Sequence, residues 1–164
     1  MNFLRAASLL GATLTMGLAT GAFALYAHTV MPGLKHTDDR TFVTAFGAMD
    51  RAIINPWFMI SAFLGALLLT ITAALTNLGR DPLPWIAAAL GLYVIVVVIT
   101  LAVNVPLNDA LKAAGDPERF ADLAAVRERF HEARWAAWNL VRTALSAGAF
   151  TSLAWALVVY GRAS

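Results

Sequence analysis

Two asparagines flank a proline near the end of a long apolar stretch, and their spacing is suited to binding chemistry. Asn104 and Asn108 are four positions apart, with Pro106 between them. In a helix, residues four apart share one face, so both amides are expected to point the same way. Pro106 has no backbone N–H, which leaves a nearby carbonyl oxygen free to bind another group. The sequence therefore predicts a polar site that includes Asn104 and Asn108.

A second row of polar and aromatic side chains lies in the last third of the chain. His131, Trp135, Trp138 and Arg142 are spaced by four, three and four, and Asn139 stands one turn beyond Trp135. This spacing predicts one helix face. The two tryptophans are expected either to anchor the helix at a membrane interface or to stack on a planar substrate.

Arg142 is the sharpest single signal, because it borders the uncharged run 143–161. An arginine inside a membrane is costly unless it meets an acid, a carbonyl, a ligand or water, so it indicates a functional site by default. The structural alternative is that Arg142 pairs with Asp50 or Asp109, or bonds to Asn104, and so holds helices together.

Arg127 also falls on an apolar stripe, which Phe120, Leu123 and Phe130 form. Because Arg127 follows Leu123 by four residues, its side chain is expected to face the protein interior. We therefore include Arg127 among the candidate substrate-binding residues.

The three histidines are weak candidates for metal ligands. His28, His36 and His131 show no i, i+3 or i, i+4 pair, which is the spacing that builds a metal site on one helix. The chain has no cysteine, and it contains no Ser-His-Asp pattern, phosphate-binding loop or dinucleotide fingerprint that we can locate. We expect no metal and no cofactor. Histidines that converge from different helices would give the alternative, a haem or copper protein.

The composition indicates an integral membrane protein. Of the 164 residues, 60% are hydrophobic and 13% are charged, whereas a soluble domain carries about 25% charged residues. Each uncharged stretch is long enough to cross a bilayer, which takes about 20 apolar residues in a helix. These stretches are residues 6–34, 52–79, 82–108 and 143–161.

We therefore predict a single all-α domain, 1–164, a four-helix membrane bundle with a short amphipathic helix between the first two spans. The first helix is expected over residues 5–31, ending at Pro32-Gly33. Thr37 is the predicted N-cap of the amphipathic helix, and Asn55-Pro56 the start of the second span. The apolar face of the amphipathic helix is expected to consist of Phe42, Phe46, Met49 and Ile53. The second span is expected to end at about Asn77 and the third to begin at about Trp85, while a fourth helix runs without a break from Asp116-Pro117 to about Tyr160.

Four spans place both termini on one side of the membrane. That side carries Arg5, Arg80 and Arg162, and the other side carries the remaining nine basic residues. The positive-inside rule then puts the long connections in the cytoplasm, and we expect a bacterial inner membrane. The basic residues alternate with acids, which predicts no nucleic-acid binding. Membrane lipid and a small lipophilic substrate are the expected partners, and the question of a homo-oligomer stays open.

Four motifs follow one another along the chain: Val30-Met31-Pro32-Gly33-Leu34, Arg51-Ala52-Ile53-Ile54-Asn55-Pro56, Asn104 to Leu111, and Arg127 to Trp135 with Asn139 and Arg142. Taken in this order, they resemble the anthrone oxygenase-like family of small four-helix membrane proteins, whose bacterial branch is largely a domain of unknown function. The likeness covers nearly the whole chain. The chain departs from the bacterial branch at Asp50, where that branch usually has asparagine, and at His131, where it commonly has an acid.

The resemblance implies a cofactor-independent oxygenase acting on an anthrone-type substrate. The fungal Pro-x-Asn-x-x-Leu element corresponds to Pro106, Asn108 and Leu111. An anthrone loses a carbon-bound proton to give an enolate that reacts with oxygen, so the protein needs a base and donors to the oxyanion. We expect His131, then Asp109, as the base, and Asn104, Asn108, Asn139 and Arg142 as donors. A lipid- or quinone-binding module without catalysis, or a membrane subunit of a partner, is the alternative.

Overall fold

The computed structural model describes residues 2–113 and 122–162, and these residues are helical through most of their length. They include four helices long and apolar enough to cross a membrane: Phe3–Lys35, Pro56–Thr76, Leu83–Lys112 and Leu123–Arg162. The predicted all-α membrane bundle is thereby confirmed. The proposed helix start at Asp116-Pro117 and the stripe residue Phe120 lie outside the described residues.

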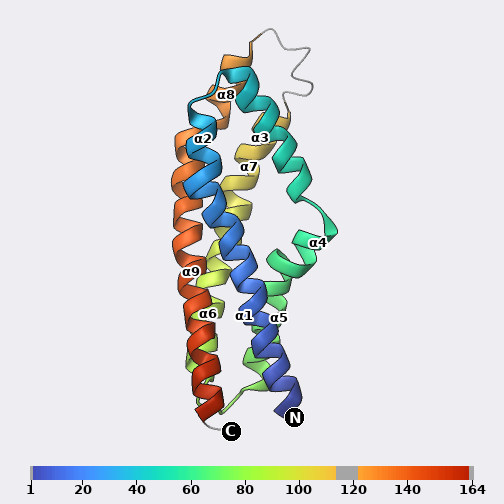
Figure 1. Ribbon diagram of the computed structural model, residues 1–164, viewed down its shortest axis with the longest axis vertical. Helices are drawn as coiled ribbons and strands as arrows, with labels where there is room; N and C mark the ends of the chain where they lie inside the picture. The colour runs from blue at the N-terminus through green and yellow to red at the C-terminus, as the bar shows by residue number, and fades with distance from the viewer. Residues whose placement is uncertain (1, 114–121, 163–164) are drawn as a thin grey trace.

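The four spans run along the long axis of the molecule, so that α1 begins and α9 ends at the same end (Figure 1). α1 packs against α5 and α9, and α6 packs against α9. The elements in chain order are α1 (Asn2–Leu25), the π-helical turn η1 (Tyr26–Val30), α2 (Met31–Lys35), α3 (Asp39–Ile53), α4 (Pro56–Phe58), the π-helical turn η2 (Met59–Phe63), α5 (Leu64–Thr76), α6 (Leu83–Ile99), the π-helical turn η3 (Thr100–Asn104), α7 (Val105–Lys112), α8 (Leu123–Phe130) and α9 (Glu132–Arg162).

The half of the bundle near the termini is held by an apolar core. Alanines at the helix contacts, such as Ala12, Ala66 and Ala89, are fully buried, and small residues of this kind let membrane helices approach closely. Tyr93 is buried among them and donates its hydroxyl hydrogen to the carbonyl oxygen of Phe63 at 3.0 Å. Because the same helices continue into the opposite half of the bundle, this apolar packing also sets the positions of the helices there.

The first span does not end at Pro32, contrary to the sequence prediction, but continues as α2 to Lys35. A proline ring clashes with the carbonyl four residues earlier. For Pro32 that residue is His28, which lies inside η1, and for Pro106 it is Ala102, which lies inside η3. The wider π-helical turn makes room for each ring, so the two prolines reshape their helices instead of ending them.

The amphipathic helix α3 begins one residue later than predicted. Asp38, rather than Thr37, is the N-cap, since its carboxylate accepts a hydrogen bond from the Thr41 N–H at 2.9 Å. Bonds from the backbone and hydroxyl of Thr41 lower the pKa of Asp38. The start of the second span is confirmed, because the Asn55 side chain accepts from the Phe58 N–H at 2.9 Å.

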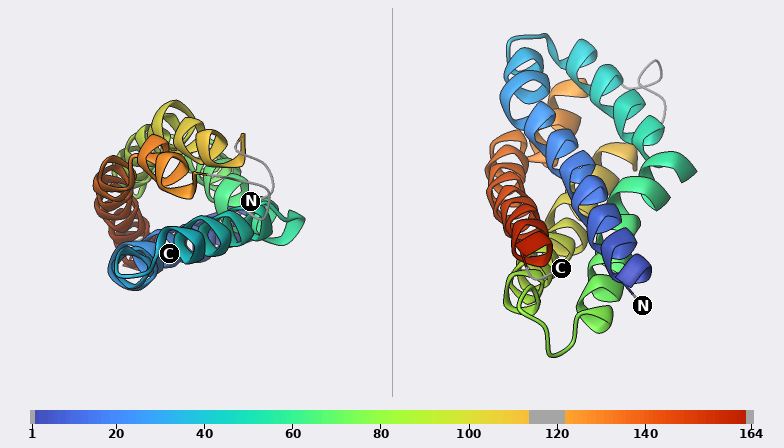
Figure 2. Two further views of the ribbon diagram at one scale, coloured as in Figure 1. Left: turned by 90° about the horizontal axis from the view of Figure 1, so that it is seen from above. Right: turned by 60° about the horizontal axis from the view of Figure 1, so that its bottom comes forward.

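The fourth helix is broken at His131, where a continuous helix was predicted. His131 adopts a left-handed backbone conformation with φ of 50° between α8 and α9. α8 thereby turns away from the axis of α9 and packs between α3 and α7 (Figure 2). A periodicity argument could not find this break, since Phe130 and Trp135 on either side of it are both buried.

The end of the bundle where α3 and α8 meet has its own aromatic core. The rings of Phe46 and Phe130 have centroids 4.5 Å apart, and Phe46 meets Trp135 edge-on at 5.3 Å. Phe42 and Tyr26 extend the same cluster. Of the predicted amphipathic face, Phe42 and Phe46 are buried while Met49 and Ile53 are half-buried; the face also includes Val43, Gly47 and Asp50.

Gly65 is the second residue of α5, two positions after the end of η2, and we expect the π-helical turn η2 to require a glycine there. A Cβ at this position would collide with the backbone carbonyl oxygen of Ile60, which the wide turn brings close. We expect Gly65→Ala to lower the free energy of unfolding by about 1–3 kcal/mol, measured by thermal unfolding in detergent. Gly91→Ala is the matched control, because a Cβ there meets nothing within 4 Å. Equal losses in the two variants would contradict this role.

Candidate functional site

A cavity of about 220 Å³ lies where the aromatic end of the bundle meets the apolar half. Its lining comes from five parts of the chain and includes residues of η1, η2 and η3. π-helical turns are rare and often occur at functional sites. The lining residues are Ala22, Phe23, Tyr26, Phe46, Asp50, Ile53, Ile54, Phe58, Met59, Phe63, Thr100, Leu101, Val105, Asn108, Lys112, Trp135, Asn139 and Arg142.

One polar wall of the cavity is a chain of hydrogen bonds that joins α3, α7 and α9. Asn108 donates to the Asp50 carboxylate at 2.7 Å and accepts from the Trp135 indole N–H at 2.7 Å. Lys112 Nζ lies 2.8 Å from the other carboxylate oxygen of Asp50. Asp50 is only 6% exposed, so one hydrogen bond, from Asn108, and one ion pair, with Lys112, hold this acid inside the bundle.

Asn104 contacts this wall from the side that faces away from the cavity. It is buried and donates to the backbone carbonyl of Trp135 at 3.4 Å. Its own side-chain oxygen is buried without a hydrogen-bond partner. Asn104 is thus one turn below Asn108 on the same side, as predicted, although it does not line the cavity.

The second polar wall is built around Arg142, which is 5% exposed. Its guanidinium donates to the Thr100 hydroxyl at 3.1 Å and to the Asn139 side-chain oxygen at 2.8 Å. Asn139 in turn donates to the backbone carbonyl of Phe23 at 3.0 Å. The guanidinium carbon also lies 4.6 Å from the centre of the Phe23 ring and 5.6 Å from that of Trp135. In the described part of the chain, Arg142 has no acidic partner.

Four of the predicted site residues line this one cavity: Asn108, Trp135, Asn139 and Arg142. Trp138 does not, because it lies on the outer side of α9 and is 36% exposed. The predicted pairing of Arg142 with Asp50 or Asp109 is wrong, since Asp50 binds Lys112 and Asn108, and Asp109 lies on the surface beside Lys112. The predicted bond to Asn104 is absent from the described residues as well.

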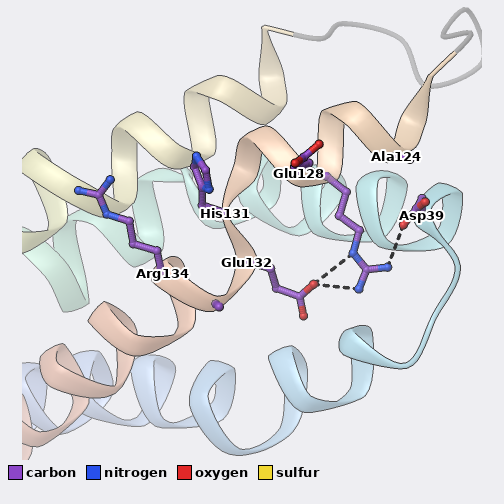
Figure 3. Close-up of a pocket in the computed structure, with 8 residues that line it drawn as sticks. Asp39, Ala124, Glu128, His131, Glu132 and Arg134 are labelled. Carbon is purple, nitrogen blue, oxygen red and sulfur yellow. Dashed lines mark hydrogen bonds and ion pairs between the residues drawn. The ribbon is translucent and has the colours of Figure 1, made fainter.

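Two more of the predicted site residues, Arg127 and His131, line a separate surface pocket of about 530 Å³ (Figure 3). Arg127 lies there and pairs with Glu132 at 2.8 Å and with Asp39 at 3.1 Å. It also donates to the backbone carbonyl of Thr37 and stacks on Phe42. Arg127 therefore fastens α8 and α9 to the start of α3. His131 is exposed in the same pocket.

His131 and Asp109 thus lie outside the cavity, and their catalytic roles stay untested predictions. The acid that the cavity does contain, Asp50, was not among the predicted site residues. Its signal was present: Phe42, Phe46 and Asp50 are spaced by four, which places an acid on the apolar face of α3. Lys112 and Thr100 were missed because each contacts a residue on a distant part of the chain, and no local sequence pattern predicts these contacts. Lys112 pairs with Asp50, and Thr100 accepts a hydrogen bond from Arg142.

No group of three or more His, Asp or Glu side chains in the described residues is placed to share a metal ion. The side chains that line the cavity are suited to acid–base chemistry and to binding an oxyanion instead. A buried carboxylate can accept a proton. A guanidinium with neighbouring amide and hydroxyl groups can stabilise negative charge on an oxygen. Aromatic and aliphatic walls suit a lipophilic ring.

Fold and site together define a four-helix integral membrane protein with a polar cavity buried beneath its aromatic end. Residues 52–152 match the family model of the anthrone oxygenases. The chain is a member of that family. This region contains η2, η3 and most of α9, and with them all of the cavity lining except Ala22, Phe23, Tyr26, Phe46 and Asp50. No curated protein and no solved structure matches the chain.

Proposed function

We propose that this protein is a membrane-embedded oxygenase that acts, without a cofactor, on a lipophilic aromatic or enolisable compound of the anthrone type. The observation that carries the proposal is that one cavity with aromatic walls is lined by both a buried carboxylate, Asp50, and a buried guanidinium, Arg142. Family membership supports the same class of reaction.

The reaction would begin with proton transfer from carbon to Asp50. This leaves an enolate whose oxygen Arg142 stabilises, with Asn139 holding the guanidinium in place. The enolate carbon then gives electrons to O₂, forming a C–O bond and a peroxide anion, which takes the proton back from Asp50. Loss of the second carbon-bound hydrogen as a proton with cleavage of the O–O bond gives a ketone and water. In balance, R₂CH₂ and O₂ become R₂C=O and H₂O.

Asp50 replaces His131 and Asp109 as the base in this proposal, because it alone of the three lines the cavity. Lys112 contacts its carboxylate while leaving 31% of its own side chain exposed. The pair could therefore exchange protons with the water outside the bundle.

We further propose that the protein resides in a bacterial inner membrane with its long connections in the cytoplasm. The support is the excess of Lys and Arg in those connections, as the positive-inside rule requires. This orientation would put the Asp50–Lys112 pair near the cytoplasmic surface and leave the apolar half of the bundle in the acyl chains.

The purified protein in detergent or nanodiscs tests the oxygenase directly, through its oxygen consumption with anthrone and the yield of anthraquinone. We expect one O₂ per anthrone at a rate well above spontaneous oxidation, and loss of the catalysed rate in Asn108→Ala while the variant stays folded. Full activity in Asn108→Ala would reject the assignment of this cavity as the active site. No catalysed uptake, together with a lipid or quinone that co-purifies, would support the non-catalytic binding module, and a Soret band in the absorption spectrum would support a haem protein.

A further inference from the structure

The charged side chains that line the cavity do not balance. They are Asp50, Lys112 and Arg142. Asp50 and Lys112 form an ion pair at 2.8 Å and offset one another. Arg142 is left as a buried positive charge, so the described lining of the cavity carries a net charge of +1.

The immediate surroundings of Arg142 supply no negative charge. Its hydrogen-bond acceptors are the Thr100 hydroxyl and the Asn139 amide, and its ring neighbours are Phe23 and Trp135. The Nε atom is buried and has no hydrogen-bond partner. A buried cation that lacks a counter-ion and a full set of acceptors is costly, and a bound anion would relieve both deficits at once.

The cavity also reaches the lipid-facing surface of the bundle. Two of its lining residues, Ile54 and Leu101, are 60% and 61% exposed. Leu101 lies inside the third span, and Ile54 just before the second. α4 stands out to the side of the bundle (Figure 1) and contributes Phe58 to the cavity lining. Because both rims are apolar and lie in or beside a span, a ligand would enter from the acyl chains of the bilayer.

We infer that the cavity binds a lipophilic mono-anion more tightly than the neutral form of the same ring system, with a negative oxygen at Arg142 and the ring between the aromatic walls. This deepens the proposed function and rests on it for the place of the substrate. In the proposed reaction that anion is the enolate left when Asp50 takes the carbon-bound proton, so Arg142 favours the product of this step over the neutral substrate. The volume of about 220 Å³ is below the ~300–1,000 Å³ of drug-sized pockets, which suits a compact planar ring.

Two probes with the same tricyclic ring test this inference, anthracene-9-carboxylate and the neutral anthracene-9-methanol. Binding is measured by fluorescence titration of the full chain at fixed detergent concentration, with partition into protein-free micelles subtracted. We expect the carboxylate to bind at least about tenfold more tightly than the alcohol, the effect of a hydrogen bond to a charged group. In Arg142→Gln the carboxylate should lose that advantage, while the alcohol keeps its affinity.

Arg51→Gln is the matched control, because Arg51 is exposed on α3 and does not line the cavity; its binding should equal that of the unaltered chain. Equal affinity of the unaltered chain for the two probes would overturn the inference, and this comparison needs no variant to fold. The outcome is separate from that of the oxygenase assay. Charge preference without oxygen consumption would retain the anion site and reject the oxygenase, and turnover without charge preference would do the reverse.

Discussion

Asp50→Asn is expected to lower the rate of oxygen consumption with anthrone by about 10²–10⁴-fold, the usual contribution of a positioned general base. The amide has the shape of the carboxylate and can still accept the 2.7 Å hydrogen bond from Asn108, so the polar wall should persist. It cannot accept a proton from carbon. Initial rates at saturating substrate, with circular dichroism and thermal unfolding of the same samples, measure the effect.

Asp109→Asn is the control for this experiment. Asp109 is on the same helix as Asn108 and also contacts Lys112, at 3.4 Å, but it is exposed and does not line the cavity. Its rate should stay close to that of the unaltered chain. If Asp109→Asn lost the activity and Asp50→Asn kept it, the base would be Asp109, the second choice from the sequence after His131, and Asp50 would have a structural role only.

The fold could be read from the sequence because lipid imposes one strong constraint. A charge-free stretch of membrane length must form a helix, since lipid offers no partner for unpaired backbone groups. The four spans and the cap at Asn55 followed from this and from local signals. What did not follow was the shape within the helices. The rule that proline ends a helix failed at Pro32, because a π-helical turn accommodates its ring.

Half of the site could be predicted, because an intramembrane arginine and two asparagines are conspicuous in an apolar chain. The choice between Trp138 and Asn139 shows the limit of spacing alone. Both lie between Trp135 and Arg142, and at ~100° per residue each falls about 50° to one side of the line joining them, so spacing cannot choose between them. The structure buries Asn139 and leaves Trp138 outside.

Asp50 was missed for a different reason. Its importance comes from the meeting of α3 with α7, and no pattern within one helix encodes that meeting. His131 was chosen for its chemistry and its spacing from Trp135. The left-handed turn at His131 itself then places the imidazole on the surface. Local periodicity is therefore a poor guide wherever the helix that carries it is interrupted.

Arg142→Met is expected to remove activity with little change in the free energy of unfolding. The bonds to Thr100 and Asn139 would be lost, at a cost of about 1.5–3 kcal/mol each because the donor is charged. Against this, a charge within a membrane span costs about 2.5–3.5 kcal/mol, and no acid among the described residues compensates it. These opposing free energies are of the same order, so we expect the Tm in detergent to change little, and kcat to fall by about 10²–10³-fold from the missing oxyanion donor.

Arg127→Met is the matched control, because the same substitution should there destabilise the fold. Arg127 has two acidic partners, Glu132 and Asp39, and accepting carbonyls, so its removal should lower the free energy of unfolding by roughly 1–3 kcal/mol. An equal fall in Tm for both variants would mean that Arg142 serves packing and not a ligand. A fall in Tm for Arg127→Met alone would identify Arg142 as a residue kept for binding and not for stability, which is the expected property of a functional site.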